Sequence, residues 1–162
     1  MSLPDTIAIE PVSAATEEVR ALVGELDEEL SAHYSVEQRH GLPLQAIFQP
    51  HVHFFVARQG DVPMGCGGVA LFADFAEVKR MYVRRSARGR GIAEVILERI
   101  EAEARTGGHS VLRLETGDRQ LAAIRFYERR GFRRCSAFGV YAEMPPQAVA
   151  ISVFYEKSLA SL

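Results

Sequence analysis

The sequence predicts an α/β fold, an α+β arrangement in which a central, mostly antiparallel mixed sheet of about six to seven strands carries helices on both faces. Two observations predict it. Three strand-like segments follow one another between residues 52 and 83 with only short turns between them, as in an antiparallel meander. From residue 91 onward, helical and strand-like segments alternate, which is typical of crossover connections. The 162 residues allow one domain, expected to span 1–162.

The N-terminal half is expected to begin with a strand over 6–12, followed by a helix. Thr16 is a candidate N-cap for that helix, because its hydroxyl can accept a hydrogen bond from a free backbone N–H of the first turn. The stretch 33–50 is mixed and leaves room for a second short helix. Apolar residues recur at helical spacing after the cap: Val19, Leu22, Val23, Leu26 and Leu30. Three further strands are expected at 52–58, 64–72 and 76–83.

The C-terminal half is expected to alternate helices and strands. Gly107-Gly108 and Gly131 are the expected ends of two helices, because glycine readily adopts the left-handed conformation that closes a helix. The prolines of Met144-Pro145-Pro146 predict a loop between the last two strands. The helices are expected at 91–105 and 119–130, and the strands at 110–115, 132–141 and 149–157.

Composition and charge exclude several classes of protein. Lysine and arginine number 19 and aspartate and glutamate 21, so the net charge of −2 gives no general attraction to nucleic acid or to an anionic membrane. The longest apolar stretches fall short of the roughly 20 residues that a bilayer span needs, and residues 1–10 lack the basic region of a signal peptide. Cys66 and Cys135 form no metal-binding pattern and are expected as free thiols. We therefore expect a cytoplasmic protein without nucleic-acid or membrane partners.

One segment, Val83 to Ala93, differs from the rest of the chain. It links an expected strand to an expected helix and contains two glycines, four arginines and no acidic residue. A helix start offers unpaired backbone N–H groups and the positive end of the helix dipole, and glycines let an anion approach the backbone. The segment is therefore predicted to bind a phosphate. It lacks the pattern GxxxxGK(S/T), and it departs from the dinucleotide pattern GxGxxG because Glu94 stands at the last glycine.

Arg88 to Ala93 fit the pattern (Q/R)xxGx(G/A) and resemble the acyl-CoA loop of the GCN5-related N-acetyltransferases, the GNAT family. The likeness extends to other motifs. Residues 77–83 resemble the fourth strand of that family, and 114–117 with 122–132 resemble its later motif, a helix with a tyrosine followed by a Gly-Phe turn. The resemblance implies the GNAT fold, in which the fourth and fifth strands splay apart to form a V-shaped slot.

The resemblance implies acetyl-CoA as the acyl donor and no metal. The pyrophosphate of acetyl-CoA is expected on the backbone N–H groups of the loop, and the pantetheine arm is expected to lie along the fourth strand. An asparagine that contacts the arm in some members is absent here, and Gly117 and Gln120 stand near its place. The expected cofactor-binding residues are Met81, Tyr82, Val83, Arg88, Gly89, Arg90, Gly91, Ile92, Ala93, Gly117, Gln120 and Phe126.

The resemblance also implies two catalytic residues. Tyr127 matches the tyrosine that protonates the departing thiolate in many members, and Glu77 matches the glutamate that serves as general base in histone-type members. Each of these two residues also has a structural interpretation. Tyr127 can be a core tyrosine, and Glu77 can be an exposed strand residue paired with Lys79 or Arg113, with a chain of waters acting as the base.

The remaining candidates have simpler explanations. His51 and His53 share one face of a strand but lack a third metal ligand in the sequence. Cys66 lies in Gly65-Cys66-Gly67-Gly68, where the glycines are expected to permit a bulge or a close backbone approach. Several aromatic and histidine residues can line the acceptor site or belong to the core: Tyr34, His40, Phe48, Phe138, Tyr141 and Phe154.

The function predicted from these residues is direct transfer of an acetyl group from acetyl-CoA to a primary amine of a small molecule or amino acid. Acetylation of a protein N-terminus or lysine is the alternative within the same class, and it requires an open groove. A non-catalytic acyl-CoA sensor and an RNA-binding domain are alternatives from other classes. Dimers are common among proteins that resemble this one, so a homodimer is compatible with the prediction.

Overall fold

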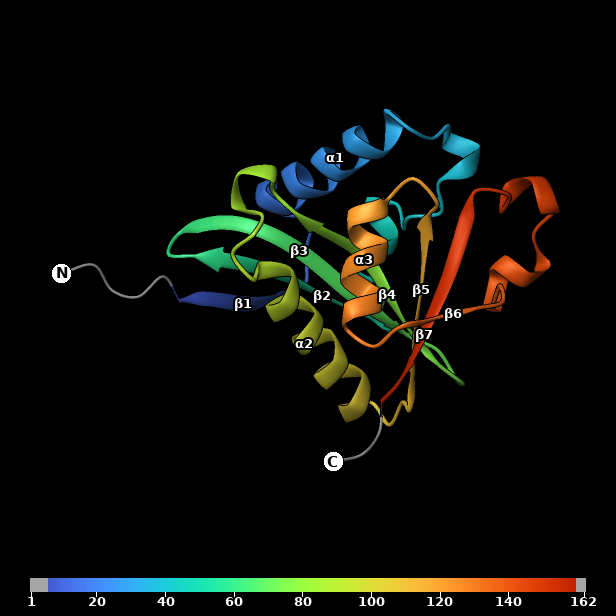
Figure 1. The fold of residues 1–162 in the computed structure, drawn as a ribbon. Coiled ribbons are helices and arrows are strands. Elements are labelled where there is room, and N and C mark those ends of the chain that lie inside the picture. Colours follow the sequence, from blue (N-terminus) through green and yellow to red (C-terminus); the bar gives the residue numbers. More distant parts are fainter. Residues whose placement is uncertain (1–5, 160–162) are drawn as a thin grey trace.

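The computed structural model describes residues 6–159 and shows seven strands in one sheet (Figure 1). The strands are β1 (Ile7–Val12), β2 (Val52–Gln59), β3 (Val62–Leu71), β4 (Ala76–Val83), β5 (Val111–Gly117), β6 (Arg133–Cys135) and β7 (Ser152–Ser158). Their order across the sheet is β1-β2-β3-β4-β5-β7-β6, and neighbours are antiparallel except for β4 and β5, which are parallel. The predicted mixed, mostly antiparallel sheet is confirmed.

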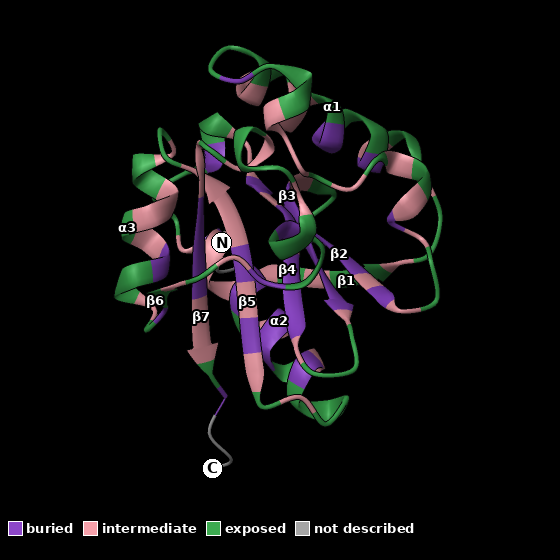
Figure 2. Cartoon of the chain, turned by 90° about the vertical axis from the view of Figure 1, so that its right-hand side faces the viewer, coloured by how far each residue is buried: buried purple, intermediate pink, exposed green. Residues whose placement is uncertain are grey.

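Three helices cover the two faces of the sheet: α1 (Glu17–Ser31), α2 (Ile92–Thr106) and α3 (Leu121–Arg129). Because side chains alternate along a strand, β2 contributes to both faces. Phe54 and Val56 pack in one buried cluster with residues of α1, whereas Ala57 packs in another with residues of α2. Figure 2 shows the buried residues along the central strands and the exposed ones on helices and loops. The expected helices on both faces are confirmed.

Helix α1 begins where the sequence predicts. The Thr16 hydroxyl accepts a hydrogen bond from the backbone N–H of Val19 at 3.2 Å, which satisfies one of the free donors of the first turn. Val19 and Leu22 are fully buried, while Leu26 and Leu30 further along the same helix are only partly covered. The stretch 33–50 contains two short 3₁₀ helices, Val36–Gln38 and Leu44–Ala46, in place of one α-helix.

Strands β4 and β5 pair only at their beginnings. Ala76 lies opposite Leu112 and Glu77 opposite Arg113, and beyond these pairs the two strands diverge, as the resemblance implied. A β-bulge lies just past the divergence. Cys66 and Gly68 on β3 face Tyr82 and Lys79 on β4, so the two residues Arg80 and Met81 stand opposite Gly67 alone.

The glycines of β3 allow this close packing. A Cβ on Gly67 would lie 2.7 Å from Met81 Sδ and 2.8 Å from Ile96 Cγ2, and one on Gly65 would lie 2.5 Å from the carbonyl oxygen of Tyr82. All three distances are shorter than side chains tolerate, so residues larger than glycine would push β4 and α2 away from β3. The bulge and the close approach expected at these glycines are both confirmed.

The prediction of a long strand over 132–141 is wrong. Only Arg133–Cys135 pairs with β7, and Gly139–Glu143 forms a 3₁₀ helix. The reason is tertiary packing, since Phe138 and Tyr141 turn inward to form a buried cluster with Phe154 of β7. The last strand starts later than expected because Pro146–Ala148 form another 3₁₀ turn.

No helix among residues 6–159 is long and apolar enough to cross a membrane. Cys66 and Cys135 are both free, as expected. Burial raises the pKa of the Cys66 thiol to about 12, and its Sγ donates to the carbonyl oxygen of Arg80 at 3.4 Å. This thiol therefore stays protonated and serves packing rather than nucleophilic chemistry.

Candidate active site

A pocket of about 400 Å³ lies beside the glycine loop between β4 and α2, and it is called the loop pocket below. Nine of the residues predicted to bind the cofactor line it: Met81, Tyr82, Val83, Arg88, Gly89, Gly91, Ile92, Ala93 and Phe126. Its other walls come from Ala87, Glu94, Ala122, Ala123, Tyr127 and Arg129. Three of the predicted residues, Arg90, Gly117 and Gln120, are not among the lining residues.

The backbone of the loop suits an anion. Gly89 and Gly91 have φ values of 81° and 82°, in the left-handed region that favours glycine. A Cβ on Gly89 would meet no atom within 4 Å, and one on Gly91 would meet only Glu94 Oε2 at 3.8 Å, so the space beside both residues is open. Gly91 is also the N-cap of α2, whose first N–H groups have no intrahelical acceptor. These donors and the helix dipole favour a phosphate here.

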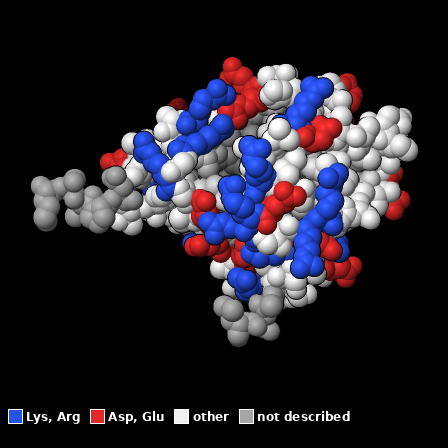
Figure 3. Space-filling view, in the orientation of Figure 1, with Lys and Arg blue, Asp and Glu red and all other residues white. Residues whose placement is uncertain are grey.

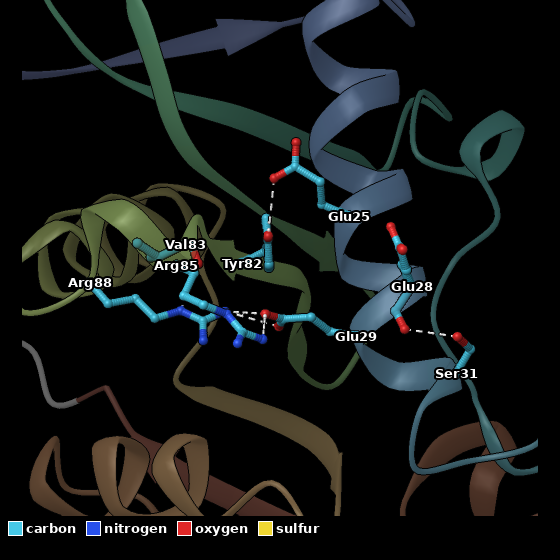
Figure 4. A network of polar contacts seen from close by, with 8 residues as sticks. All are labelled: Glu25, Glu28, Glu29, Ser31, Tyr82, Val83, Arg85 and Arg88. Carbon is cyan, nitrogen blue, oxygen red and sulfur yellow. Dashed lines mark hydrogen bonds and ion pairs between the residues drawn. The ribbon is translucent and has the colours of Figure 1, made fainter.

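Three of the four arginines of the loop form ion pairs with α1, and Figure 4 shows two of them, Arg85 and Arg88, beside Glu29. Arg84 forms an ion pair with Glu25 at 2.8 Å, and Arg88 forms one with Glu29 at 2.9 Å. Arg85 also reaches Glu29, at 3.2 Å. Part of the positive charge that the sequence places in this loop is therefore compensated by acidic residues of α1.

The fourth arginine of the loop, Arg90, turns away and donates to Gln59 Oε1 at 3.0 Å. On the face seen in Figure 3, basic side chains stand around a depression with acidic groups between them. This mixture matches the small net charge and gives a local patch rather than a uniformly basic surface.

A second pocket, of about 140 Å³, lies between the diverging parts of β4 and β5 and is called the slot pocket. α1, α3 and the segment after α1 complete its walls. Its lining residues are Leu26, Leu30, Tyr34, Gln38, Arg39, His40, Gly41, Val78, Arg80, Met81, Leu114, Glu115, Thr116, Gly117, Gln120, Ala123, Tyr127 and Ile151. Gly117 and Gln120, predicted beside the cofactor, thus face this second pocket.

The slot pocket also divides the aromatic candidates. Tyr34 and His40 line it, whereas Phe138, Tyr141 and Phe154 form the cluster beside β7 and Phe48 packs against the α1 core. The ring of Tyr34 lies directly over Gly117, where any Cβ would collide with it. Its hydroxyl accepts a hydrogen bond from the backbone N–H of Arg119 at 2.7 Å, which fixes the ring in the pocket wall.

The two pockets meet at three residues, because Met81, Ala123 and Tyr127 line both. Tyr127 is 7 % exposed, and burial raises the pKa of its phenol well above the usual value. Its hydroxyl therefore remains protonated near neutral pH and is available as a proton donor. Tyr127 thus lies at the boundary between the two pockets, and its part in the reaction stays a prediction.

Glu77 lies elsewhere. Its carboxylate is buried, accepts a hydrogen bond from the Tyr141 hydroxyl at 2.6 Å and forms an ion pair with Lys79 Nζ at 2.9 Å. Glu77 lines neither the loop pocket nor the slot pocket. The structure therefore places it in a buried polar cluster with Lys79 and Tyr141, near enough to Glu115 for both charges to act on that carboxyl.

Sequence reasoning missed Glu115, the carboxylate that does line the slot pocket. The Ser152 hydroxyl donates to Glu115 Oε2 at 2.6 Å, and burial raises the pKa of the Glu115 carboxyl. The available signal was strand alternation, since Leu112 and Leu114 are buried toward α2 and Glu115 must face the opposite side.

Among the described residues, no group of three or more potential ligands could hold a metal ion. His53 Nδ1 lies 2.9 Å from Glu103 Oε1, and the ring of His51 packs against Phe72 with 5.5 Å between centroids. The two histidines thus each contact a neighbouring side chain.

Comparison with known proteins identifies the class. The Acetyltransferase (GNAT) family matches residues 18–132, which is more than half of the chain. The chain therefore belongs to the GNAT family and is an N-acetyltransferase.

Individual relatives agree with this assignment. The chain is 42% identical over 156 residues to a protein of Azospirillum brasilense named IAA acetyltransferase, covering 95% of this chain and 97% of that protein. A Klebsiella pneumoniae structure assigned as an acyl-CoA N-acyltransferase is 33% identical with a TM-score of 0.78, covering 97% of this chain and 100% of that one. A GNAT acetyltransferase of Elizabethkingia anophelis with acetyl-CoA bound shares the fold, at 16% identity and a TM-score of 0.65, covering 96% and 99% of the two chains.

Proposed function

We propose that this protein transfers an acetyl group from acetyl-CoA directly to a primary amine of a small molecule or amino acid. The observation that carries the proposal is the meeting of two pockets at Tyr127, one beside an anion-binding helix start and one between the diverging strands. A donor held in the loop pocket and an acceptor held in the slot pocket would bring their reacting atoms together at this boundary.

The loop pocket supports acetyl-CoA as the donor. The pyrophosphate would lie on the free N–H groups from Arg88 to Ala93, where no Cβ of Gly89 or Gly91 intrudes. The pantetheine arm would lie along Met81, Tyr82 and Val83, beyond the point where β4 stops pairing with β5. A backbone N–H near Met81 would stabilise the thioester oxyanion, an interaction worth about 3–4 kcal/mol for one donor.

The slot pocket supports a small acceptor. It measures about 140 Å³ and is bordered by residues of α1, α3 and Tyr34, a size that suits a small molecule better than a polypeptide segment. The amine must be neutral to attack the thioester carbonyl carbon, and Glu115 is the group positioned to take its proton, directly or through a water. As the C–S bond breaks, the Tyr127 hydroxyl would protonate the CoA thiolate. In this arrangement Glu77 has a structural role beside Lys79.

Replacement of Glu115 by glutamine tests the choice of base. We expect kcat/KM for the amine to fall by about tenfold to a hundredfold near neutral pH, because the pocket loses its proton acceptor. Glu77→Gln is the matched control, and it should lower the unfolding temperature by breaking the contact with Lys79 while reducing kcat/KM less. A larger loss of activity in Glu77→Gln would return the role of base to Glu77.

The same variant makes a prediction about stability. Because the folded-state pKa of Glu115 is raised, its carboxyl stabilises the fold below the unfolded value of 4.5, and this contribution is lost as pH rises through the folded value. Glu115→Gln should therefore unfold at a higher temperature than the wild type at pH 7, by about 2–4 °C for each kcal/mol relieved. The difference should vanish below about pH 4.5. Thermal unfolding across pH measures it, and an equal or lower midpoint at pH 7 would contradict the prediction.

Thermal unfolding with acetyl-CoA tests the proposed function itself. At about 100 times its dissociation constant a ligand adds roughly 2.7 kcal/mol to stability, which for a chain of this size raises the midpoint by about 5–10 °C. ATP and NAD at the same concentration are the controls. A shift with ATP or NAD and none with acetyl-CoA would overturn the assignment of the loop pocket. A shift with acetyl-CoA together with thiol release on adding amines would exclude a non-catalytic sensor.

A further inference from the structure

Arg80 has an unusual backbone conformation. Its φ of 54° makes it the one non-glycine residue in the left-handed region among residues 6–159. It lies in the bulge of β4, and a bulge re-aims the side chains of its strand. An arginine in this region is strained, and such strain is characteristic of positions where a side chain must be held in one direction for function.

Arg80 lines the slot pocket and also a neighbouring pocket of about 180 Å³ that Asp27 and Gly41 border, and its hydrogen bonds are incomplete. Its side chain is 5 % exposed, and Nη2 donates to Asp27 Oδ1 at 2.7 Å. Asp27 is itself about half exposed, so it compensates the buried charge from the outer side only. The Nε–H is buried and has no acceptor. A buried donor without a partner is costly, and a guanidinium without a second carboxylate retains the capacity for one.

Neighbouring residues are arranged around this guanidinium. Gly41 lies so close that any Cβ there would collide with Arg80 Nη1. Arg39 lines the same pocket and adds a second positive charge, with its Nη1 donating to the backbone oxygen of Asp27 at 3.4 Å. Glu115 and Tyr127 line the pocket as well. The slot pocket therefore combines two cationic groups with a single carboxylate, Glu115, among its described lining residues.

We propose that the acceptor is an amine that also carries a carboxylate, the simplest case being an amino acid, and that Arg80 binds this carboxylate. The inference rests on the proposed function and narrows its acceptor class. The carboxylate accepts hydrogen bonds from the Arg80 guanidinium, with Arg39 adding charge, while the amino group lies toward Glu115 and the thioester near Tyr127. The strained backbone of the bulge would then orient the Arg80 side chain toward this carboxylate.

This arrangement predicts discrimination by charge. A ligand without the carboxylate leaves the buried Arg80 donor unpaired, and sites built around such groups reject ligands that lack the partner far more strongly than hydrophobic sites reject a missing methylene. We therefore expect kcat/KM to be about 10²-fold or more higher for an amine carrying a carboxylate than for the same amine with a neutral amide in its place.

The experiment uses matched pairs of acceptors. Each common amino acid is compared with its carboxamide in an assay of thiol release from acetyl-CoA by the full-length protein. A second readout is thermal unfolding of the protein saturated with CoA in the presence of the N-acetyl amino acids and their amides. The acids should be preferred in both measurements.

Variants of this chain locate the preference. Arg80→Gln should reduce kcat/KM for the acid to the value for its amide while changing the amide little. Gly41→Ala keeps every charge but displaces the end of the Arg80 side chain, so it should lower the same ratio. Arg58→Gln is the control, because Arg58 is also a partly buried, ion-paired arginine but pairs with Glu10 and Glu18 away from both pockets. Its ratio of acid to amide should equal that of the wild type.

The ratio separates binding of a carboxylate from a purely structural role. If Arg80 only joined β4 to α1 through Asp27, Arg80→Gln would lower stability and affect acid and amide equally. The inference is overturned if the wild type gives the same kcat/KM and the same midpoint shift for each acid and its amide. It is also overturned if no carboxylate has any effect. If acetyl-CoA still raises the unfolding midpoint in that case, the proposed function stands and only the carboxylate inference fails. If acetyl-CoA does not raise the midpoint, the proposed function itself is overturned.

Discussion

Replacing Gly91 by glutamate is expected to abolish binding of acetyl-CoA, with a loss of affinity of more than about 100-fold. The new side chain would enter the open space beside the loop, and its negative charge would occupy the helix N-terminus where the pyrophosphate is proposed to bind. Isothermal titration or a thermal-shift series with acetyl-CoA measures the loss. Unchanged affinity would show that the donor phosphates bind elsewhere.

The control for this variant lies at the other end of the same helix. Gly108 has a φ of 84°, close to the 82° of Gly91, and a Cβ there would meet nothing within 4 Å. Gly108→Glu therefore introduces the same side chain with the same backbone strain, far from the loop pocket. It should lower the unfolding temperature about as much as Gly91→Glu while leaving the affinity for acetyl-CoA unchanged, so strain and electrostatics can be distinguished.

Replacing Tyr127 by phenylalanine is expected to lower kcat by about 10²-fold or more, because the departing thiolate loses its proton donor. The affinity for acetyl-CoA should stay nearly constant, since the ring remains in the wall between the pockets. Burial raises the pKa of this phenol, so the wild type should show no loss of the acid form up to at least pH 9. Steady-state rates of thiol release across pH check both statements.

Tyr155→Phe is the matched control for Tyr127→Phe. Its hydroxyl donates to Glu128 Oε2 at 3.1 Å, and the residue lines neither pocket. Removing it deletes one phenol from the same buried cluster and should leave kcat unchanged. Full activity of Tyr127→Phe would mean that a water or another group protonates the thiolate.

The fold was largely predictable because its signals are local. The Thr16 cap, the apolar stripe of α1 and the stop at Gly107 each depend on a few neighbouring residues, and the structure agrees with all three. The strand expected over 132–141 failed because its outcome depends on distant partners. Phe138 and Tyr141 find a buried cluster with Phe154, and that packing outweighs strand propensity.

The site was predictable only where it follows a motif. The loop and Tyr127 stand in patterns of fixed spacing, and they do meet at one place in the structure. Glu77 and Glu115 could not be ranked from the sequence, because strand alternation gives the face of each side chain but not the point where β4 and β5 diverge. Their difference arises from the divergence of β4 and β5, which opens the slot beside Glu115 and leaves Glu77 at the paired end.

Helix α1 lines the slot pocket and also pairs with Arg88, a residue of the loop pocket. α1 supplies Leu26 and Leu30 to the slot pocket, and from the same few turns it supplies Glu25 and Glu29 to the arginines of the loop. A phosphate bound in the loop pocket would compete with Glu29 for Arg88. It would thereby weaken the ion pair between α1 and the loop. If this shifts Leu26 or Leu30, filling one pocket would change the free energy of filling the other, and by linkage the change would have the same size in both directions. The substrate that binds first would then set the affinity for the second.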